Sequence, residues 1–407
     1  MDIIARKSSE QTIPHGPDVV EALPQRVGVP PAAPAGCRHA LTAVARLEWR
    51  TADGGDPATV VQDFLTAHGL PVADLTRPAR HDPTGVCGAS LYVSAAAGAR
   101  MVGAPTGPPT PVPALPDVAV VVHAHTDRPA PPPPASRPWW LGQWRPSWTP
   151  DQHAAAVDTV RAAIARGDVY QVNLVGHAAA DYTGDPLPAL ARLGALPGAR
   201  YGGTLHGPGW ALGCASPETL VEVTAGRILT RPIKGTRPAT PTGRRDLLAS
   251  AKERAEHVMI VDLERNDLAR VARTGSVRVD ELFAVRRWCD LWQAESTVSA
   301  VAADGLALAD LLRAVCPGGS VTGAPKLAAL AEIAACEPVG RGAGMGALGW
   351  VGPGHVDLGL TIRTAAADPH RMHLWAGGGI TWDSDPHAEV VEAAAKAAPL
   401  RAALARP

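Results

Sequence analysis

Residues 149–174 read TPDQHAAAVDTVRAAIARGDVYQVNL and contain a complete helix signal followed by a strand signal. Thr149 can cap a helix that has proline at its first position and Gln152 at its third, which is the capping-box pattern. Gly167 is a typical residue to end that helix. Residues 169–174 then alternate between apolar and polar side chains, so they predict a strand. A helix and a strand of ordinary length, joined by a short turn, indicate a layered domain.

The same signals recur through the chain and predict an α+β (α/β) fold. Strands are expected at residues 118–125, 209–214, 220–223, 227–229, 346–351, 358–364 and 372–375. Helices are expected at residues 149–166, 246–270, 307–315, 326–336 and 388–405. Because the strands cluster and long helices separate the clusters, we expect sheets with helices packed around them.

Proline content divides the chain into three parts. Residues 1–35 are polar and interrupted by proline, which predicts a loose N-terminal arm. Residues 36–148 are expected to form the N-terminal part of the fold, with proline-rich connectors at 104–116 and 129–138. Residues 149–407 are expected to form the main catalytic domain.

Composition excludes several classes of protein. The 407 residues include 38 Lys+Arg and 39 Asp+Glu, so the net charge is −1 and gives no electrostatic case for nucleic-acid binding. The longest strongly apolar run, 118–122, is far too short to span a bilayer, and the N-terminus lacks a secretory signal. Six scattered cysteines without a CxxC pair indicate a reducing compartment. We therefore expect a cytoplasmic protein without a membrane or nucleic-acid partner.

Two glycine-rich segments are expected to be unrelated to nucleotide binding. Residues 344–349 fit GxGxxG, but a strand and a turn follow where a dinucleotide site needs a helix. Residues 318–326 resemble a P-loop, but two residues separate Gly323 from Lys326.

A pair of histidines in an expected strand, His123 and His125, has no visible third metal ligand, so the sequence gives no case for a metal site there.

Two helix segments each carry a pair of acidic residues three positions apart. Glu253 and Glu256 form the first pair, and Glu389 and Glu392 form the second. If the two helices face each other, these carboxylates can converge on a hard cation such as Mg²⁺. The alternative is that both are ordinary solvated faces, with Glu392 paired to Lys396.

Lys234 lies between Arg231 and Arg237, directly after an expected strand. Neighbouring positive charges would lower its pKa and leave a nucleophilic amine, although a solvated turn lysine remains the alternative. Glu218 is a candidate acid. Arg363, in an apolar strand segment, is suited to clamp a carboxylate, and residues 376–379 could form a backbone nest for an anion.

Seven of these segments occur together in one order: 169–174, 215–218, 231–237, 252–270, 318–326, 360–364 and 376–392. In this order they resemble the chorismate-utilising enzymes, and within them the component I branch of the aminodeoxychorismate synthases. The resemblance covers residues ~150–400. It implies the chorismate-binding fold, in which antiparallel sheets pack as a sandwich with surrounding helices.

The resemblance also implies a role for each matching residue. Glu256 and Glu392 match direct Mg²⁺ ligands, and Glu253 and Glu389 match residues that support the ion through water. Lys234 matches a nucleophile and Glu218 a general acid. The residues that match substrate-binding positions are Gly235, Thr236, Ser320, Arg363, Gly377, Gly378, Gly379 and Lys396.

Position 234 separates the branches of the family. Related anthranilate synthases carry alanine there, whereas aminodeoxychorismate synthases carry lysine, which attacks C2 of chorismate before ammonia attacks C4. Gln171 replaces the lysine with which isochorismate and salicylate synthases activate water. The resemblance therefore implies amination of chorismate at C4 to 4-amino-4-deoxychorismate, for para-aminobenzoate and folate or for specialised metabolism.

Ammonia is expected from a separate glutamine amidotransferase subunit, component II, since no glutaminase motif is visible in the chain. The same-chemistry alternative is anthranilate synthase component I or 2-amino-2-deoxyisochorismate synthase. A different class is a non-catalytic homologue that binds chorismate. Gln293 and Gly344 depart from the family pattern, where His and Tyr are common, and both departures weaken the anthranilate alternative more.

Overall fold

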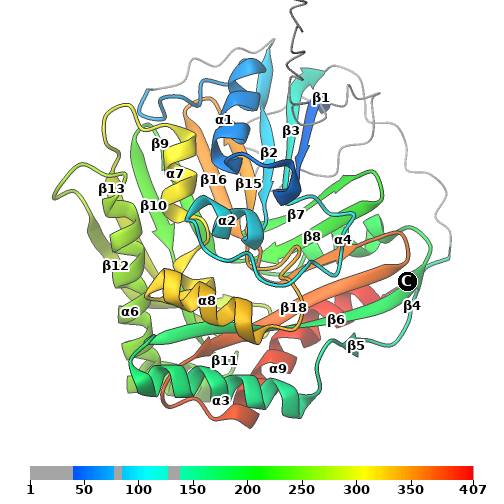
Figure 1. The fold of residues 1–407 in the computed structure, drawn as a ribbon, viewed down its shortest axis with the longest axis vertical. Coiled ribbons are helices and arrows are strands. Elements are labelled where there is room, and N and C mark those ends of the chain that lie inside the picture. The colour runs from blue at the N-terminus through cyan, green and yellow to red at the C-terminus, as the bar shows by residue number, and fades with distance from the viewer. Residues whose placement is uncertain (1–39, 78–84, 127–137, 407) are drawn as a thin grey trace, which may run out of the picture.

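The computed structural model describes residues 40–77, 85–126 and 138–406, which form two antiparallel sheets with helices packed around them (Figure 1). The largest cluster of buried apolar side chains draws on both sheets, including Leu47 and Val221 from one and Leu212 and Trp375 from the other. The main core therefore lies between the sheets. The predicted α+β sandwich of antiparallel sheets with surrounding helices is confirmed.

The larger sheet has ten strands. In spatial order they are β1 (Ala40–Trp49), β3 (Val118–Thr126), β2 (Val86–Val93), β15 (Ala347–Gly352), β16 (His355–Leu360), β9 (Thr219–Thr224), β10 (Arg227–Arg231), β13 (Leu291–Val301) and β11 (Ile233–Pro238), with β12 (Arg278–Trp288) on β13. Because β2 pairs with β15, strands from the beginning and the end of the described chain share this sheet.

The smaller sheet has eight strands. In spatial order they are β14 (Gly323–Ala324), β6 (Gln171–Thr183), β18 (Arg371–Ile380), β17 (Thr364–Ala367), β8 (Trp210–Ser216) and β7 (Tyr201–Gly207), with β4 (Trp140–Leu141) and β5 (Arg145–Pro146) on β6.

Helices cover the outer faces of the sandwich (Figure 1). They are α1 (Pro57–Ala67), α2 (Ala95–Met101), α3 (Pro150–Arg166), α4 (Pro186–Gly194), α5 (Pro241–Ala249), α6 (Ala251–Ala269), α7 (Leu308–Val315), α8 (Lys326–Cys336) and α9 (Pro386–Ala405). Two short 3₁₀ turns, η1 (Thr51–Asp53) and η2 (Gly319–Val321), complete the elements.

The predicted capping box of α3 is confirmed. The Thr149 hydroxyl accepts a hydrogen bond from the Gln152 backbone N–H at 3.2 Å, and the Gln152 side chain accepts one from the Thr149 N–H at 2.8 Å. Gly167 ends the helix with a left-handed φ of 83°. The following strand extends much further than predicted, to Thr183, because it pairs with β18 along ten residues.

Two predicted elements were wrong in detail, and one hairpin was missed. The single helix at 246–270 is two helices, because Ser250 leaves the helical conformation and caps α6 instead. Arg363 does not lie inside a strand but between β16 and β17, with a φ of 53°. The hairpin of β12 and β13 was not predicted, since β12 is largely exposed and lacks a clear apolar alternation.

Several other predictions concern the N-terminal arm, a proline-rich connector and the two glycine-rich segments. The expected arm at 1–35 and most of the connector at 129–138 lie outside the described residues. The glycine-rich residues 344–349 lead into strand β15, and Lys326 forms a buried ion pair with Asp267 at 2.6 Å. That neither segment binds nucleotide phosphates stays a prediction.

The α3 cap gives a test of stability. Thr149→Ala should lower the free energy of unfolding by about 1 kcal/mol, because the first turn of α3 loses a hydrogen-bond acceptor. Thr149→Ser keeps the hydroxyl and should lie within a few tenths of a kcal/mol of wild type. Urea denaturation followed by circular dichroism measures both. Equal stability of the two variants would show that the cap contributes nothing.

Candidate active site

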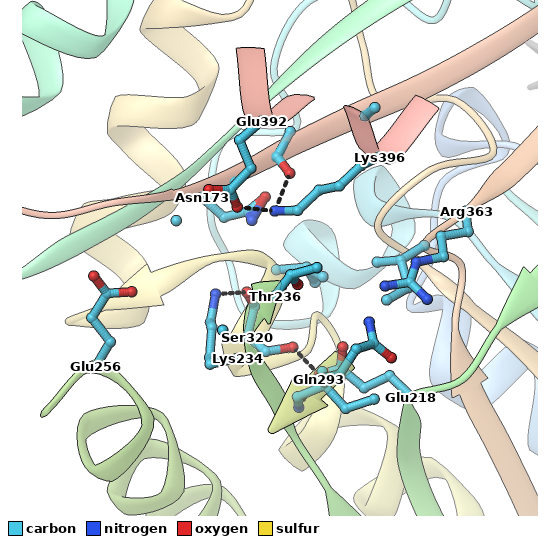
Figure 2. Close-up of a pocket in the computed structure, with 18 of the residues that line it drawn as sticks. Asn173, Glu218, Lys234, Thr236, Glu256, Gln293, Ser320, Arg363, Glu392 and Lys396 are labelled. Atoms are coloured by element: carbon cyan, nitrogen blue, oxygen red, sulfur yellow. Dashed lines mark hydrogen bonds and ion pairs between the residues drawn. The ribbon is translucent and has the colours of Figure 1, made fainter. Parts of the chain in front are cut away.

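A cavity of about 120 Å³ lies where the two sheets meet, and side chains from both sheets line it (Figure 2). Every residue for which the sequence predicted a catalytic, binding or metal role lines this cavity: Glu218, Lys234, Gly235, Thr236, Glu253, Glu256, Ser320, Arg363, Gly377, Gly378, Gly379, Glu389, Glu392 and Lys396. The structure thus brings together segments that are far apart in the sequence. Their individual roles remain proposals.

Two of these residues occupy the points where the chain crosses from one sheet to the other. Glu218 lies between β8 of the smaller sheet and β9 of the larger, and Arg363 lies between β16 of the larger and β17 of the smaller. The two crossings are joined by backbone hydrogen bonds, from Ala215 N–H to the Arg363 carbonyl and from Leu360 N–H to the Glu218 carbonyl, both at 3.1 Å. The crossings therefore fix the acid and the guanidinium relative to each other.

Lys234 lies on β11 with its amine inside the cavity. Its Nζ donates a hydrogen bond to the Ser320 carbonyl at 2.9 Å (Figure 2). Burial lowers the pKa of Lys234 below 10.5, and the Glu218 and Glu256 carboxylates oppose this change.

The predicted cause of that lowered pKa was wrong. Arg231 and Arg237, the two arginines held responsible, are engaged by Glu222 at 3.0 Å and by Glu253 at 2.8 Å. Removal from water, rather than repulsion by flanking arginines, is what favours the neutral amine.

Glu218 is 3% exposed and engages two donors. The Ser320 hydroxyl donates to its Oε1 at 2.5 Å and the Ile233 backbone N–H at 3.2 Å. Burial raises the pKa of Glu218 above 4.5, although these hydrogen bonds and the charge of Lys234 act in the opposite direction. A buried carboxyl of raised pKa is suited to hold a proton as a general acid.

Arg363 is buried, and its guanidinium stacks over the Trp288 ring at 3.6 Å from the centroid. Burial lowers its pKa to about 9, mainly through desolvation, so it stays cationic at neutral pH. Gln293, with its amide oxygen turned toward Arg363, accepts hydrogen bonds from the guanidinium. From the sequence, Gln293 was evident only as a departure from the family pattern, and its contact with Arg363 was not predicted.

The glycine segment of β18 is not the backbone nest that was predicted. Residues 376–379 are extended and pair with β6, so their backbone groups belong to a sheet ladder. These glycines matter because they have no side chain and therefore leave space in the cavity. A Cβ at Gly378 would lie 3.2 Å from Glu389 Oε2, and one at Gly379 would lie 2.5 Å from Gln171 Nε2 and 3.1 Å from Lys234 Nζ.

The β6 strand beneath these glycines presents amide side chains that lack partners. Both amide atoms of Gln171 and the Oδ1 of Asn173 are buried without a hydrogen-bond partner among the described residues. Asn173 lines the cavity although it was not predicted as a site residue. The alternation of residues 169–174 places Gln171 and Asn173 on the same face of the strand. This was the sequence signal that could have identified Asn173 as a site residue.

A buried ion pair behind the cavity holds two of its walls together. Arg341 binds Glu337 at 2.7 Å and donates to the carbonyls of Val321 at 2.6 Å and Asn173 at 2.7 Å. Glu337 in turn accepts from the Val175 N–H at 3.0 Å. The pair therefore fixes η2, which carries Ser320, against β6.

The four predicted carboxylates occupy α6 and α9 on two sides of the cavity, and each contacts a neighbour. Glu253 binds Arg237, Glu256 accepts from the Thr381 hydroxyl at 3.3 Å, Glu389 accepts from Ser384 at 2.7 Å, and Glu392 pairs with Lys396 at 2.7 Å. Burial raises the pKa values of Glu256 and Glu389, whereas Lys396 lowers that of Glu392.

These residues fit a hard divalent cation in donor chemistry, since carboxylate oxygen is the ligand that Mg²⁺ takes from proteins. Their present arrangement is open. Among residues 40–77, 85–126 and 138–406, no three His, Cys, Asp or Glu side chains are grouped closely enough to enclose a metal ion.

None of the described helices is both long enough and apolar enough to cross a bilayer.

This chain is similar in sequence to component 1 of two related kinds of synthase. Aminodeoxychorismate synthase component 1 of Bacillus subtilis is 37% identical over 275 residues, which cover 66% of this chain and 58% of that protein. Anthranilate synthase component 1 of Streptomyces coelicolor is 38% identical over 276 residues, which cover 65% and 53%. The chain thus spans a little over half the length of these relatives.

The structure of anthranilate synthase component I from Streptococcus pneumoniae is similar with a TM-score of 0.73 and 25% identity, over 97% of this chain and 94% of that one. The family model described as chorismate binding enzyme matches residues 110–402, well over half of the chain. This protein therefore belongs to the family of chorismate binding enzymes.

Proposed function

We propose that this protein replaces the C4 hydroxyl of chorismate with an amino group derived from ammonia, forming 4-amino-4-deoxychorismate. The observation that carries the proposal is the buried Lys234 amine, which contacts the backbone of Ser320 while the Ser320 hydroxyl contacts Glu218. A potential nucleophile and a potential acid therefore share one small turn. The names of relatives such as the Bacillus subtilis protein support the same reaction.

Chorismate carries two carboxylates, and we assign Arg363 and Lys396, two of the four cationic side chains among the described residues that line the cavity, to bind them. Arg363 is held by Trp288 and Gln293, and Lys396 is held by Glu392 and by the Gly377 carbonyl at 3.1 Å. Gly378 and Gly379 leave room for the ring beside Lys234. We propose that the ring of the substrate lies between Lys234 and Glu218.

In the first half of the reaction, neutral Lys234 forms a bond from Nζ to C2. The two ring double bonds shift by one position, the C4–O bond breaks, and the hydroxyl takes the proton of Glu218 and leaves as water. In the second half, ammonia bonds to C4, the double bonds return, and the C2–N bond breaks to release neutral Lys234. The new ammonium group returns one proton to Glu218, so the cycle closes with water as the by-product.

We propose in addition that Glu256 and Glu392 bind Mg²⁺ directly and that Glu253 and Glu389 support it through water. When bound, the ion supplies positive charge that neutralises a substrate carboxylate. We further propose that a separate glutamine amidotransferase subunit provides the ammonia, which is consistent with the name component 1 of the relatives.

The covalent step predicts a mass change at one residue. Incubation with chorismate and Mg²⁺ but no ammonia should add substrate-derived mass to the peptide that contains Lys234, because the second half cannot proceed. Lys234→Ala should lose the adduct and reduce turnover on the order of 10³-fold. Adduct on Lys252 or Lys396, or an active Lys234→Ala variant, would refute this role.

The pH dependence of adduct formation follows from the two altered pKa values. Lys234 must be neutral to react, so the rate of adduct formation should rise as the pH increases. This rise should level off at a pH below the ordinary lysine pKa of 10.5. Glu218 must be protonated, so the rate should fall at higher pH with a pKa above 4.5. Glu218→Gln should be slow and should lack the falling limb. A falling limb that persists in this variant would assign it to another group.

The metal proposal can be tested by binding rather than turnover. Glu256→Gln and Glu392→Gln should weaken Mg²⁺ binding at least about 10–100-fold, measured by isothermal titration calorimetry with chorismate and without ammonia. Asp262→Asn is the matched control, because this exposed residue shares α6 with Glu256 but pairs with Arg265. Equal Mg²⁺ affinity in all three variants would show that these carboxylates do not bind the ion.

Product analysis separates this proposal from its alternative. With Mg²⁺ and ammonium, chorismate should yield 4-amino-4-deoxychorismate, and an added lyase should release para-aminobenzoate. Glutamine should support turnover only when a glutaminase subunit is added. Fluorescent anthranilate, formed without a lyase, would instead place the protein with the anthranilate synthases. Absence of any chorismate consumption would indicate a binding protein.

A further inference from the structure

A second cavity, of about 220 Å³, lies on the other side of one wall of the catalytic cavity. Its lining comes mainly from α3, α9, β6 and β18 and from the segment before α3. Ala376 of β18 lines both cavities. Most of its surface is apolar and comes from Trp148, Leu374, Val390, Ala393, Ala394 and Ala397.

Helix periodicity explains why α9 borders two different cavities. Glu389, Glu392 and Lys396 lie on one face and line the catalytic cavity, whereas the adjacent face carries Val390, Ala393 and Ala397. The small alanines leave a flat surface.

Trp148 contributes a second flat group to the lining. The Trp148 indole packs against Gly176 so closely that a Cβ there would lie 2.8 Å from Nε1. It also stacks with the His153 ring at 4.4 Å between centroids. The lining of the cavity, here called the slot, therefore combines a flat indole with a row of small side chains.

This cavity lacks the carboxylates that line the catalytic cavity. None of the described residues that line it is an aspartate or a glutamate. Burial lowers the pKa of His153 and lowers that of His177 to about 3, so both rings are neutral at pH 7. Both nitrogens of His177 are also occupied, by the Ser147 hydroxyl at 2.6 Å and by His373 at 3.1 Å.

Arg401 is the cation that lines the cavity. Its guanidinium lies over the Trp144 ring at 5.7 Å from the centroid, and its Nε is buried without a hydrogen-bond partner among the described residues. Arginine retains its proton even when burial lowers its pKa. A half-buried cation that pairs with no carboxylate among the described residues, in a largely apolar cavity, suits an anion with an apolar body.

We propose that this cavity binds a small aromatic monocarboxylate, separately from the catalytic site. The ring lies in the slot between Trp148 and the alanines of α9, and the carboxylate accepts hydrogen bonds from Arg401. A single cation selects one carboxylate, and the apolar walls disfavour a hydroxylated or dianionic ligand. Because the cavity lies outside the catalytic one, this inference goes beyond the proposed function and is tested without turnover.

The test is direct titration of the full chain with benzoate, without chorismate, by isothermal titration calorimetry. One benzoate per chain should bind, and neutral benzamide should bind at least tenfold more weakly. Arg401→Met should weaken benzoate binding at least tenfold. Arg273→Met is the matched control, because Arg273 is an exposed arginine that pairs with Asp304 far from this cavity, and it should bind as wild type does.

A second variant covers the case in which Arg401→Met fails to fold. Ala394 is exposed on α9, so Ala394→Leu should fold normally, fill the slot and abolish binding. Arg363→Met tests the competing location, and benzoate affinity should not change in it. Binding that survives Ala394→Leu, or that is lost in Arg363→Met instead, would place benzoate in the catalytic cavity and overturn the proposal. Absence of benzoate binding to wild type would overturn it as well.

Discussion

The backbone hydrogen bonds between the two sheet crossings are the constraint on which the rest of the site depends. Ala215 donates to Arg363 and Leu360 donates to Glu218, so two crossings far apart in the chain form one joint. Buried polar backbone groups must be paired, and this pairing leaves little freedom for either crossing to move. Glu218 and Arg363 thus lie side by side at the junction of the sheets, and the cavity is built outward from them.

One physical effect prepares both reactive groups in the proposed mechanism. Removal from water disfavours charge, so it lowers the pKa of Lys234 and raises that of Glu218. The amine is shifted toward its nucleophilic form and the carboxyl toward its protonated form. Such burial is costly unless polar neighbours remain, and η2 provides two of them through the Ser320 carbonyl and hydroxyl. The buried Arg341–Glu337 pair holds that turn against β6.

Local signals in the sequence predicted the local structure well. The capping box at Thr149 and the alternation around residue 172 depend on neighbours in the chain, and both were right. The family motifs predicted which residues gather in one cavity. The reason for the low pKa of Lys234 could not be predicted, because it depends on burial by distant segments. The same holds for Arg363, whose left-handed φ is imposed by a sheet crossing, and for Gln293, whose contact crosses the fold.

Helix α9 shows how a single element can serve environments of opposite charge. Its acidic face lines the catalytic cavity, where Glu392 and Lys396 pair. Its alanine face lines the slot, which Arg401 also lines. Charges on adjacent faces of one helix interact weakly when each is neutralised or solvated locally, so the two faces can differ without conflict. Ala376 and α9 are thus common to the linings of both cavities. A shift of α9 in response to an occupant of the slot would therefore reach Lys396 without passing through the core between the sheets.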